Sequence, residues 1–398
     1  MKKTTLASLV GAAAFAAAGA ANATIVVGGE NGYEFSVDGN INQFYIYTDQ
    51  NSNGGNQDNS QVANGLLPTF LGFNVKAPEI NGLTVGARVS ISPSTNNGSY
   101  LQNGNAMEQR EAFATVDGGF GQILMGKALG LYSANNILLD QTLFGVGATS
   151  FTANGTQNTG ATSLGRIGYG YEYAYWRSQI RWTSVDMNGF QFAAAIVDND
   201  TTFMPATVNE KDPRYEASLS YATAFDGGSA KLWLDGMTSS VELDGSSERS
   251  NAWTLGGQLV FGGFEAVAAY YDSKGQGVAG LGGLGAYTTD GNARDGDGYY
   301  AQLGYRFGGQ TFVAASYGES SLKRDSLNTF AAGAAIDADT NAFYEDFDKN
   351  SMWTLGVYHD VTANLKLVAE YSQMETEYHL RSGKDKVDVI AVGGFISW

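Results

Sequence analysis

The chain has 398 residues, 23 basic and 40 acidic side chains, a formal net charge of −17, and no cysteine. This acidity argues against nucleic acid as a partner, because phosphates attract Lys and Arg. The lack of cysteine excludes disulfides and thiolate metal sites. Glycine is abundant at 53 and proline scarce at 5, which suits many strands joined by tight turns.

Residues 1–23 have the pattern of a secretory signal peptide. Lys2 and Lys3 precede an apolar, alanine-rich run, and a small-residue cleavage pattern follows at 21–23. A spanning helix needs about 20 strongly apolar residues, and this run is shorter. We therefore expect cleavage near Thr24 and one mature domain over 24–398, because no linker divides it. Loss of the two lysines changes the net charge from −17 to −19.

Strand-like segments recur along residues 24–398, and in most of them every second residue is apolar. In one example Leu83, Val85 and Val89 share a face, while the alternate residues are small, polar or charged. This period of two predicts β-strands with unlike faces. The hydropathy of each segment is weak even in a membrane-spanning strand, because only one side of the strand faces lipid.

Short turns and long loops alternate along the chain. Turns such as Asn81-Gly82, Asn188-Gly189 and Gly262-Gly263 suit tight hairpins, since these residues tolerate positive φ. The longer polar segments lie at 49–66, 93–107, 128–165, 199–214, 239–250, 274–297, 321–350 and 374–385. Seven turns and eight loops predict an all-β fold, a transmembrane antiparallel β-barrel of about sixteen strands around an aqueous channel. A β-sandwich or β-solenoid would not explain the asymmetry of turns and loops.

The third long segment, 128–165, contains one charged residue, Asp140. A connection of this length is unusual in a compact domain unless it has a function or is disordered. Apolar residues such as Leu131, Ile137 and Leu143 argue for packing. We expect this segment to fold into the lumen and narrow the channel, and a surface loop is the alternative.

Five basic residues are candidates for the pore constriction together with Asp140. Alternation places four of them on the water-facing side of strands near the long segment, and the fifth lies at its root: Arg88, Arg110, Arg177, Arg181 and Lys127. Such a cluster focuses positive potential in a narrow mouth, and pore selectivity depends on charge and diameter. Solvated residues without a role in permeation are the alternative. Lumen-side acids and the charge of −19 favour a weak preference for cations.

Several segments resemble the Gram-negative trimeric general diffusion porins. They are Arg110-Glu111-Ala112-Phe113-Ala114-Thr115, the run from Gly119 to Lys127, and Arg177 to Trp182. The last strand, with Trp398, Ile396, Val392 and Ile390 on one face, is similar to the strand that barrel-assembly machinery recognises. The resemblance covers nearly all of 24–398. It implies a homotrimer in the Gram-negative outer membrane that passes small hydrophilic solutes and ions passively, with the third loop inside the pore.

Two positions depart from the family pattern. Lys127 stands where arginine is usual, and Lys lacks the planar fork of Arg. Trp398 replaces the usual terminal phenylalanine. A substrate-selective porin and a closed structural or adhesive barrel remain alternatives.

No enzyme, cofactor or metal site is predicted. The chain has two histidines and no G-x-S-x-G motif. Carboxylates in the long loops suit divalent cations, which would bridge the protein to lipopolysaccharide, and the alternative is solvated loop charge. Aromatic residues near strand ends predict girdles at the membrane interfaces.

Overall fold

The computed structural model describes residues 25–52, 55–93, 95–96, 107–149, 163–199, 208–243, 246–277, 286–287, 292–323, 347–379 and 382–398. The predicted signal peptide, 1–23, lies outside these residues. None of the helices in the described ranges has the length and apolarity needed to cross a membrane.

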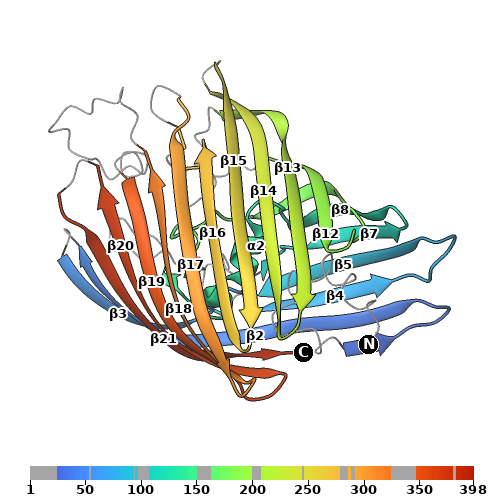
Figure 1. The fold of residues 1–398 in the computed structure, drawn as a ribbon, viewed down its shortest axis with the longest axis horizontal. Coiled ribbons are helices and arrows are strands. Elements are labelled where there is room, and N and C mark those ends of the chain that lie inside the picture. The colour runs from blue at the N-terminus through green and yellow to red at the C-terminus, as the bar shows by residue number, and fades with distance from the viewer. Residues whose placement is uncertain are drawn as a thin grey trace.

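The described residues form mainly antiparallel strands (Figure 1). In chain order they are β1 Ile25–Gly28, β2 Glu34–Ser52, β3 Gly55–Ala63, β4 Phe70–Lys76, β5 Thr84–Pro93, β6 Met107–Glu108, β7 Ala112–Gly118, β8 Gly121–Leu129, β9 Ala148–Thr149, β10 Ser163–Gly165, β11 Trp176–Thr183, β12 Phe190–Val197, β13 Val208–Phe225, β14 Gly228–Leu243, β15 Ser246–Phe261, β16 Phe264–Lys274, β17 Asp295–Phe307, β18 Thr311–Leu322, β19 Phe347–Asp360, β20 Leu365–Tyr378 and β21 Asp385–Ser397. Helix α2 spans Ala134–Leu139, and the 3-10 helix η3 spans Gln141–Phe144.

The main sheet closes on itself through β2. This strand pairs with β3 and β4 along one edge and with β21 along the other. Residues 35–37 of β2 pair with β4 on one edge and with β1 on the other. Because β21 pairs with that same other edge, β1 and β21 occupy one strand position in the barrel. Likewise β3 and β4 occupy one strand position beside β2, and β6 and β7 occupy one position beside β5. The nineteen strands of this sheet therefore occupy sixteen positions in a closed barrel, which confirms the predicted strand number.

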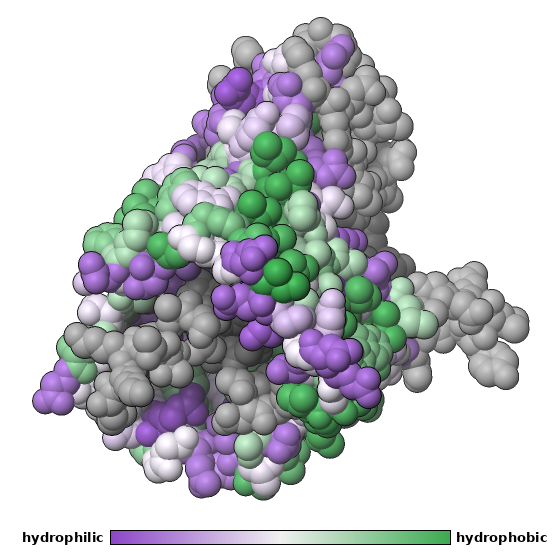
Figure 2. Space-filling view, turned by 90° about the vertical axis from the view of Figure 1, so that its right-hand side faces the viewer, coloured by the Kyte–Doolittle hydropathy of each residue, from purple (hydrophilic) through white to green (hydrophobic). Residues whose placement is uncertain are grey.

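The two faces of the barrel wall differ as the alternation predicts. On β14 and β15, Leu234 and Leu255 are 46% and 52% exposed, whereas Trp233 and Thr254 beside them are 1% and 0% exposed. The outward side chains are apolar, so this face suits lipid. Figure 2 shows a hollow on one side of the molecule that hydrophilic residues border, with hydrophobic residues farther out.

The predicted tight turns are confirmed. Asn81 and Gly82 have φ of 55° and 76°, and Gly262 and Gly263 have φ of 56° and 92°, the left-handed conformations that two-residue hairpins require.

Two predicted long loops are wrong. The segment predicted at 49–66 belongs largely to β2 and β3, and the segment at 239–250 belongs largely to β14 and β15, with 244–245 between them. Most residues in the ends of these strands are polar. A search for apolar alternation therefore ends too early.

Candidate functional site

The connection from β8 to β11 is fixed to the barrel wall at its start. The backbone N–H groups of Leu131 and Tyr132 both donate to Oε2 of Glu216 on β13, at 2.6 and 3.2 Å. Arg214 donates from Nε to Oε1 of the same carboxylate at 2.6 Å. Ser133 then adopts a φ of 67°, and α2 begins at the next residue. The sharp turn directs the chain along the buried face of β14 and β15.

Helix α2 contacts three strands through one buried residue, Asn136. Its Nδ2 donates to Oγ1 of Thr254 at 3.1 Å, and its Oδ1 accepts from Nε1 of Trp233 at 3.1 Å. The hydroxyl of Tyr300 on β17 donates to its backbone carbonyl at 3.1 Å. Figure 1 shows α2 behind β14 to β16. All three partners belong to the face opposite the apolar outer side chains.

Asp140, the charged residue of the predicted segment, is fully buried beside Arg166. Its Oδ1 lies 3.8 Å from Nε of Arg166, and both side chains are 0% exposed. Asp140 also accepts hydrogen bonds from the hydroxyl of Tyr171 at 2.7 Å and from the backbone and hydroxyl of Thr142. Arg166 donates to the carbonyl of Met352 at 2.9 Å. The pair thus joins both ends of the connection to the wall.

A second carboxylate holds the turn after η3. Oε2 of Glu370 on β20 accepts from the backbone N–H groups of Val146 and Gly147 at 2.7 and 3.0 Å. Its Oε1 accepts from the hydroxyl of Tyr358. Gly145 packs so closely that a Cβ at this position would lie 1.9 Å from Oε1. The wall therefore carries carboxylates where the connection presents N–H groups.

Glu172 joins the end of the connection to its start. Its carboxylate accepts from the hydroxyl of Tyr132 at 2.7 Å and from Oγ of Ser273 on β16 at 2.6 Å. Burial is the main cause that raises the pKa of Glu172 from 4.5 to about 7; the charge of Asp272 acts in the same direction, and the two hydrogen bonds and the charge of Arg214 act against it. Below about pH 7 the folded protein therefore favours the neutral acid.

This shift predicts a pH dependence of stability. Between pH 4.5 and about 7 the folded protein holds a proton that the unfolded chain releases, so stability falls as pH rises through this window. The total loss is about 3 kcal/mol. In heat denaturation of the barrel in detergent, the difference in midpoint between the native protein and Glu172→Gln should grow from pH 8 to pH 5 in favour of the native protein. A constant difference would contradict this prediction.

Arg88 lies on the water-facing side, but two carboxylates surround it. Nη1 of Arg88 is 2.7 Å from Oδ2 of Asp38, and its Nε is 2.7 Å from Oε2 of Glu111. Arg110 pairs with Glu108 at 2.8 Å. Neither arginine contributes an uncompensated positive charge. Neither forms an ion pair with Asp140 among the described residues.

Lys127 lies on the opposite face of the wall from Arg177 and Arg181, so the expectation that it joins them is wrong. It pairs across the strands with Ser178, on the face where Met125 and Ile180 are 46% and 60% exposed. Arg177 and Arg181 pair with Ala128 and Leu124, which are buried. Paired residues share a face of the sheet, and successive residues of a strand alternate between faces. Lys127 precedes the inward-facing Ala128 by one residue, so it lies on the outer face.

Arg177 and Arg181 remain together at the root of the connection. The guanidinium of Arg177 lies 4.8 Å from the ring centroid of Tyr175. Nη1 of Arg181 donates to the carbonyl of Leu129 at 3.4 Å. Two positive charges thus stand where β8 ends and β11 begins.

The sequence reasoning missed Arg166, Glu172 and Tyr132. Arg166 lies one residue beyond the predicted segment, 128–165. The signal that would have identified it is the lone aspartate, since a buried carboxylate needs a partner.

The terminal strand has the expected apolar face. Ile390, Val392 and Ile396 are 45%, 53% and 56% exposed. Trp398 exchanges backbone hydrogen bonds with Gly39 of β2.

Solved structures that share this barrel have low sequence identity to the chain. The anion-selective porin from Comamonas acidovorans aligns with a TM-score of 0.64 at 14% identity, over 92% of this chain and 100% of that one. The outer membrane channel DcaP of Acinetobacter baumannii gives 0.64 at 15% identity, over 93% and 99%. OmpF of Salmonella typhi in complex with daunomycin gives 0.57 at 14% identity, over 94% and 100%.

No match was found among curated proteins. The family model described as Gram-negative porin matches residues 6–379. This match spans nearly all of the barrel described above. The chain therefore belongs to the Gram-negative porin family.

Proposed function

We propose that the connection between β8 and β11 narrows a water-filled channel through which small hydrophilic solutes and ions diffuse passively across the outer membrane. The main support is that its contacts go to the face of the wall opposite the apolar side chains, through Glu216, Asn136, Arg166 and Glu370. Membership of the porin family agrees with a passive channel. Residues 150–162 of the connection lie outside the described ranges.

Reconstitution in a planar bilayer under a salt gradient tests this function. The expected result is stepwise conductance with a reversal potential that shows a weak preference for cations. A closed structural or adhesive barrel would give no steps. A substrate-selective porin would give steps that one solute saturates or blocks.

Neutralising Arg177 and Arg181 should strengthen the preference for cations. The two guanidinium groups supply positive potential at the root of the connection, and charge in a narrow mouth biases ion passage. Arg177→Gln together with Arg181→Gln should shift the reversal potential toward that of the cation. Arg249→Gln is the matched control, because Arg249 is exposed on the outer face of β15. An unchanged reversal potential would remove both arginines from selectivity.

The partners follow from the same proposal. A homotrimer is supported by the apolar outer face and by the solved trimer form of OmpT from Vibrio cholerae, which aligns with a TM-score of 0.51 at 12% identity. Barrel-assembly machinery would recognise the face of Ile390, Val392, Ile396 and Trp398. Outer-membrane lipopolysaccharide would contact the wall near the long loops, with divalent cations as bridges. Residues 1–23 would direct export and be removed.

A further inference from the structure

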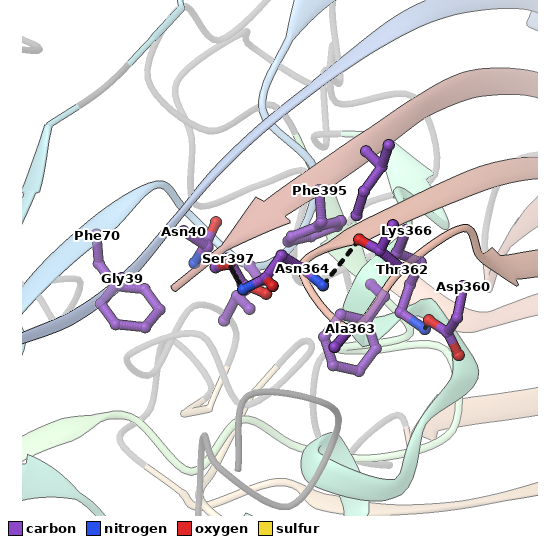
Figure 3. A pocket seen from close by; sticks show the side chains of 13 residues that line it. Gly39, Asn40, Phe70, Asp360, Thr362, Ala363, Asn364, Lys366, Phe395 and Ser397 are labelled. Carbon is purple, nitrogen blue, oxygen red and sulfur yellow. Dashed lines mark hydrogen bonds and ion pairs between the residues drawn. The ribbon is translucent and has the colours of Figure 1, made fainter. Parts of the chain in front are cut away.

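A pocket lies at the short-turn end of the wall, between β2, β20 and β21 (Figure 3). Its volume is about 50 Å³ apart from the open solvent at its mouth. Six of the residues that line it are Leu67, Phe70, Phe144, Asp360, Lys366 and Phe395. They come from four separate parts of the chain.

Aromatic rings form much of the lining. The centroids of Phe144 and Phe395 are 5.5 Å apart with an interplanar angle of 77°, and Phe44 packs against Phe395 at 5.9 Å. Leu67 is 7% exposed and adds aliphatic surface. Ring edges and faces meet in this arrangement, which favours a further flat ring in the pocket.

The charged groups of the pocket have spare donors rather than spare acceptors. Nζ of Lys366 forms an ion pair with Oδ1 of Asp360, and Nη1 of Arg306 lies 3.5 Å from Oδ2. Both oxygens of Asp360 thus face a cation. Within the described residues Lys366 donates one hydrogen bond, although an ammonium group has three donors.

The ammonium group of Lys366 lies close to an aromatic ring of the pocket. Its Nζ lies 5.3 Å from the ring centroid of Phe144, and its side chain is 15% exposed. Lys366 and Arg306 outnumber Asp360 by one charge. The terminal residue, Trp398, forms backbone hydrogen bonds with Gly39 and does not line the pocket.

We propose that this pocket binds small aromatic carboxylates, with the ring against Phe144 and Phe395 and the carboxylate on Nζ of Lys366. The proposal rests on the proposed channel function and deepens it by naming a class of solute. A charge-assisted hydrogen bond from the ammonium group supplies the preference for an anion over a neutral ring. The aromatic lining supplies the preference over a short aliphatic acid.

Sodium benzoate is the probe, with benzamide and sodium acetate as comparison compounds. Binding is measured by titration calorimetry on the folded full-length protein in detergent, and by interruption of single-channel current when the compound is added. Benzoate should bind at least tenfold more tightly than benzamide or acetate. Absence of current steps in salt alone would contradict the channel function, while calorimetry would still decide whether the pocket binds benzoate.

Two substitutions with opposite expected effects separate binding from general disturbance. Lys366→Gln should weaken benzoate binding about tenfold, because it removes the charge-assisted bond. Asp360→Asn should strengthen binding severalfold, because it removes the nearest negative charge. Lys349→Gln is the matched control, since Lys349 is an ion-paired lysine on the outer face of β19.

The proposal would be overturned by equal binding of benzoate and benzamide, by no measurable binding to the native protein, or by effects of Lys366→Gln and Asp360→Asn in the same direction. Phe144→Leu adds a further check. It keeps most of the apolar volume but removes the ring, so the binding of benzoate should weaken while the binding of acetate stays unchanged.

Discussion

Arg166→Met is expected to destabilise the barrel by about 3–5 kcal/mol, the usual cost when one partner of a buried ion pair is removed. Asp140 would keep its hydrogen bonds from Tyr171 and Thr142 but would carry an uncompensated charge at 0% exposure. Detachment of the connection should also enlarge the conductance step and add current noise. Heat denaturation in detergent and planar-bilayer recording measure the two effects.

The control is a double-mutant cycle. Asp140→Asn removes the negative charge that Arg166→Met leaves buried without a partner. The double variant should therefore lose less stability than Arg166→Met alone. Arg249→Met, at an exposed arginine, should change neither stability nor conductance. If the two single substitutions and the double substitution were simply additive, the coupling between Asp140 and Arg166 would be absent.

Gly145→Ala is expected to release the turn after η3. The added Cβ would lie 1.9 Å from Oε1 of Glu370, so either the carboxylate or the turn must move. Movement breaks the hydrogen bonds from Val146 and Gly147 to a charged acceptor, each worth about 1.5–3 kcal/mol. We expect a loss of about 3–6 kcal/mol in stability for the two bonds and a larger conductance step, measured by heat denaturation and planar-bilayer recording.

Gly119→Ala is the matched control for this prediction. Gly119 lies in the turn between β7 and β8, and a Cβ there would meet no atom within 4 Å. Glu370→Ala provides a second route, since it removes the acceptor without adding bulk. Native conductance in both Gly145→Ala and Glu370→Ala would show that this contact does not hold the connection in place.

The strand number was predictable from residues alone because the patterns that mark a strand and a tight turn lie within the strand and the turn themselves. Side chains of a strand alternate with a period of two, and a turn such as Asn81-Gly82 needs only its own two residues to adopt positive φ. These are local properties. The polar ends of β2, β3, β14 and β15 lack the apolar alternation, so their lengths were not predictable.

The residues alone therefore predict a sixteen-stranded barrel with an apolar outer face and a long third connection that needs packing. The contacts of that connection follow from the folded arrangement, in which Arg166 lies beside Asp140 and the carboxylates of Glu216 and Glu370 accept from backbone N–H groups. The same holds for the position of Lys127 on the outer face. The physical reason is distance along the chain, since Asn136 bonds Thr254 and Val146 bonds Glu370 across more than a hundred residues. Such contacts depend on strand register and curvature, which local patterns do not encode.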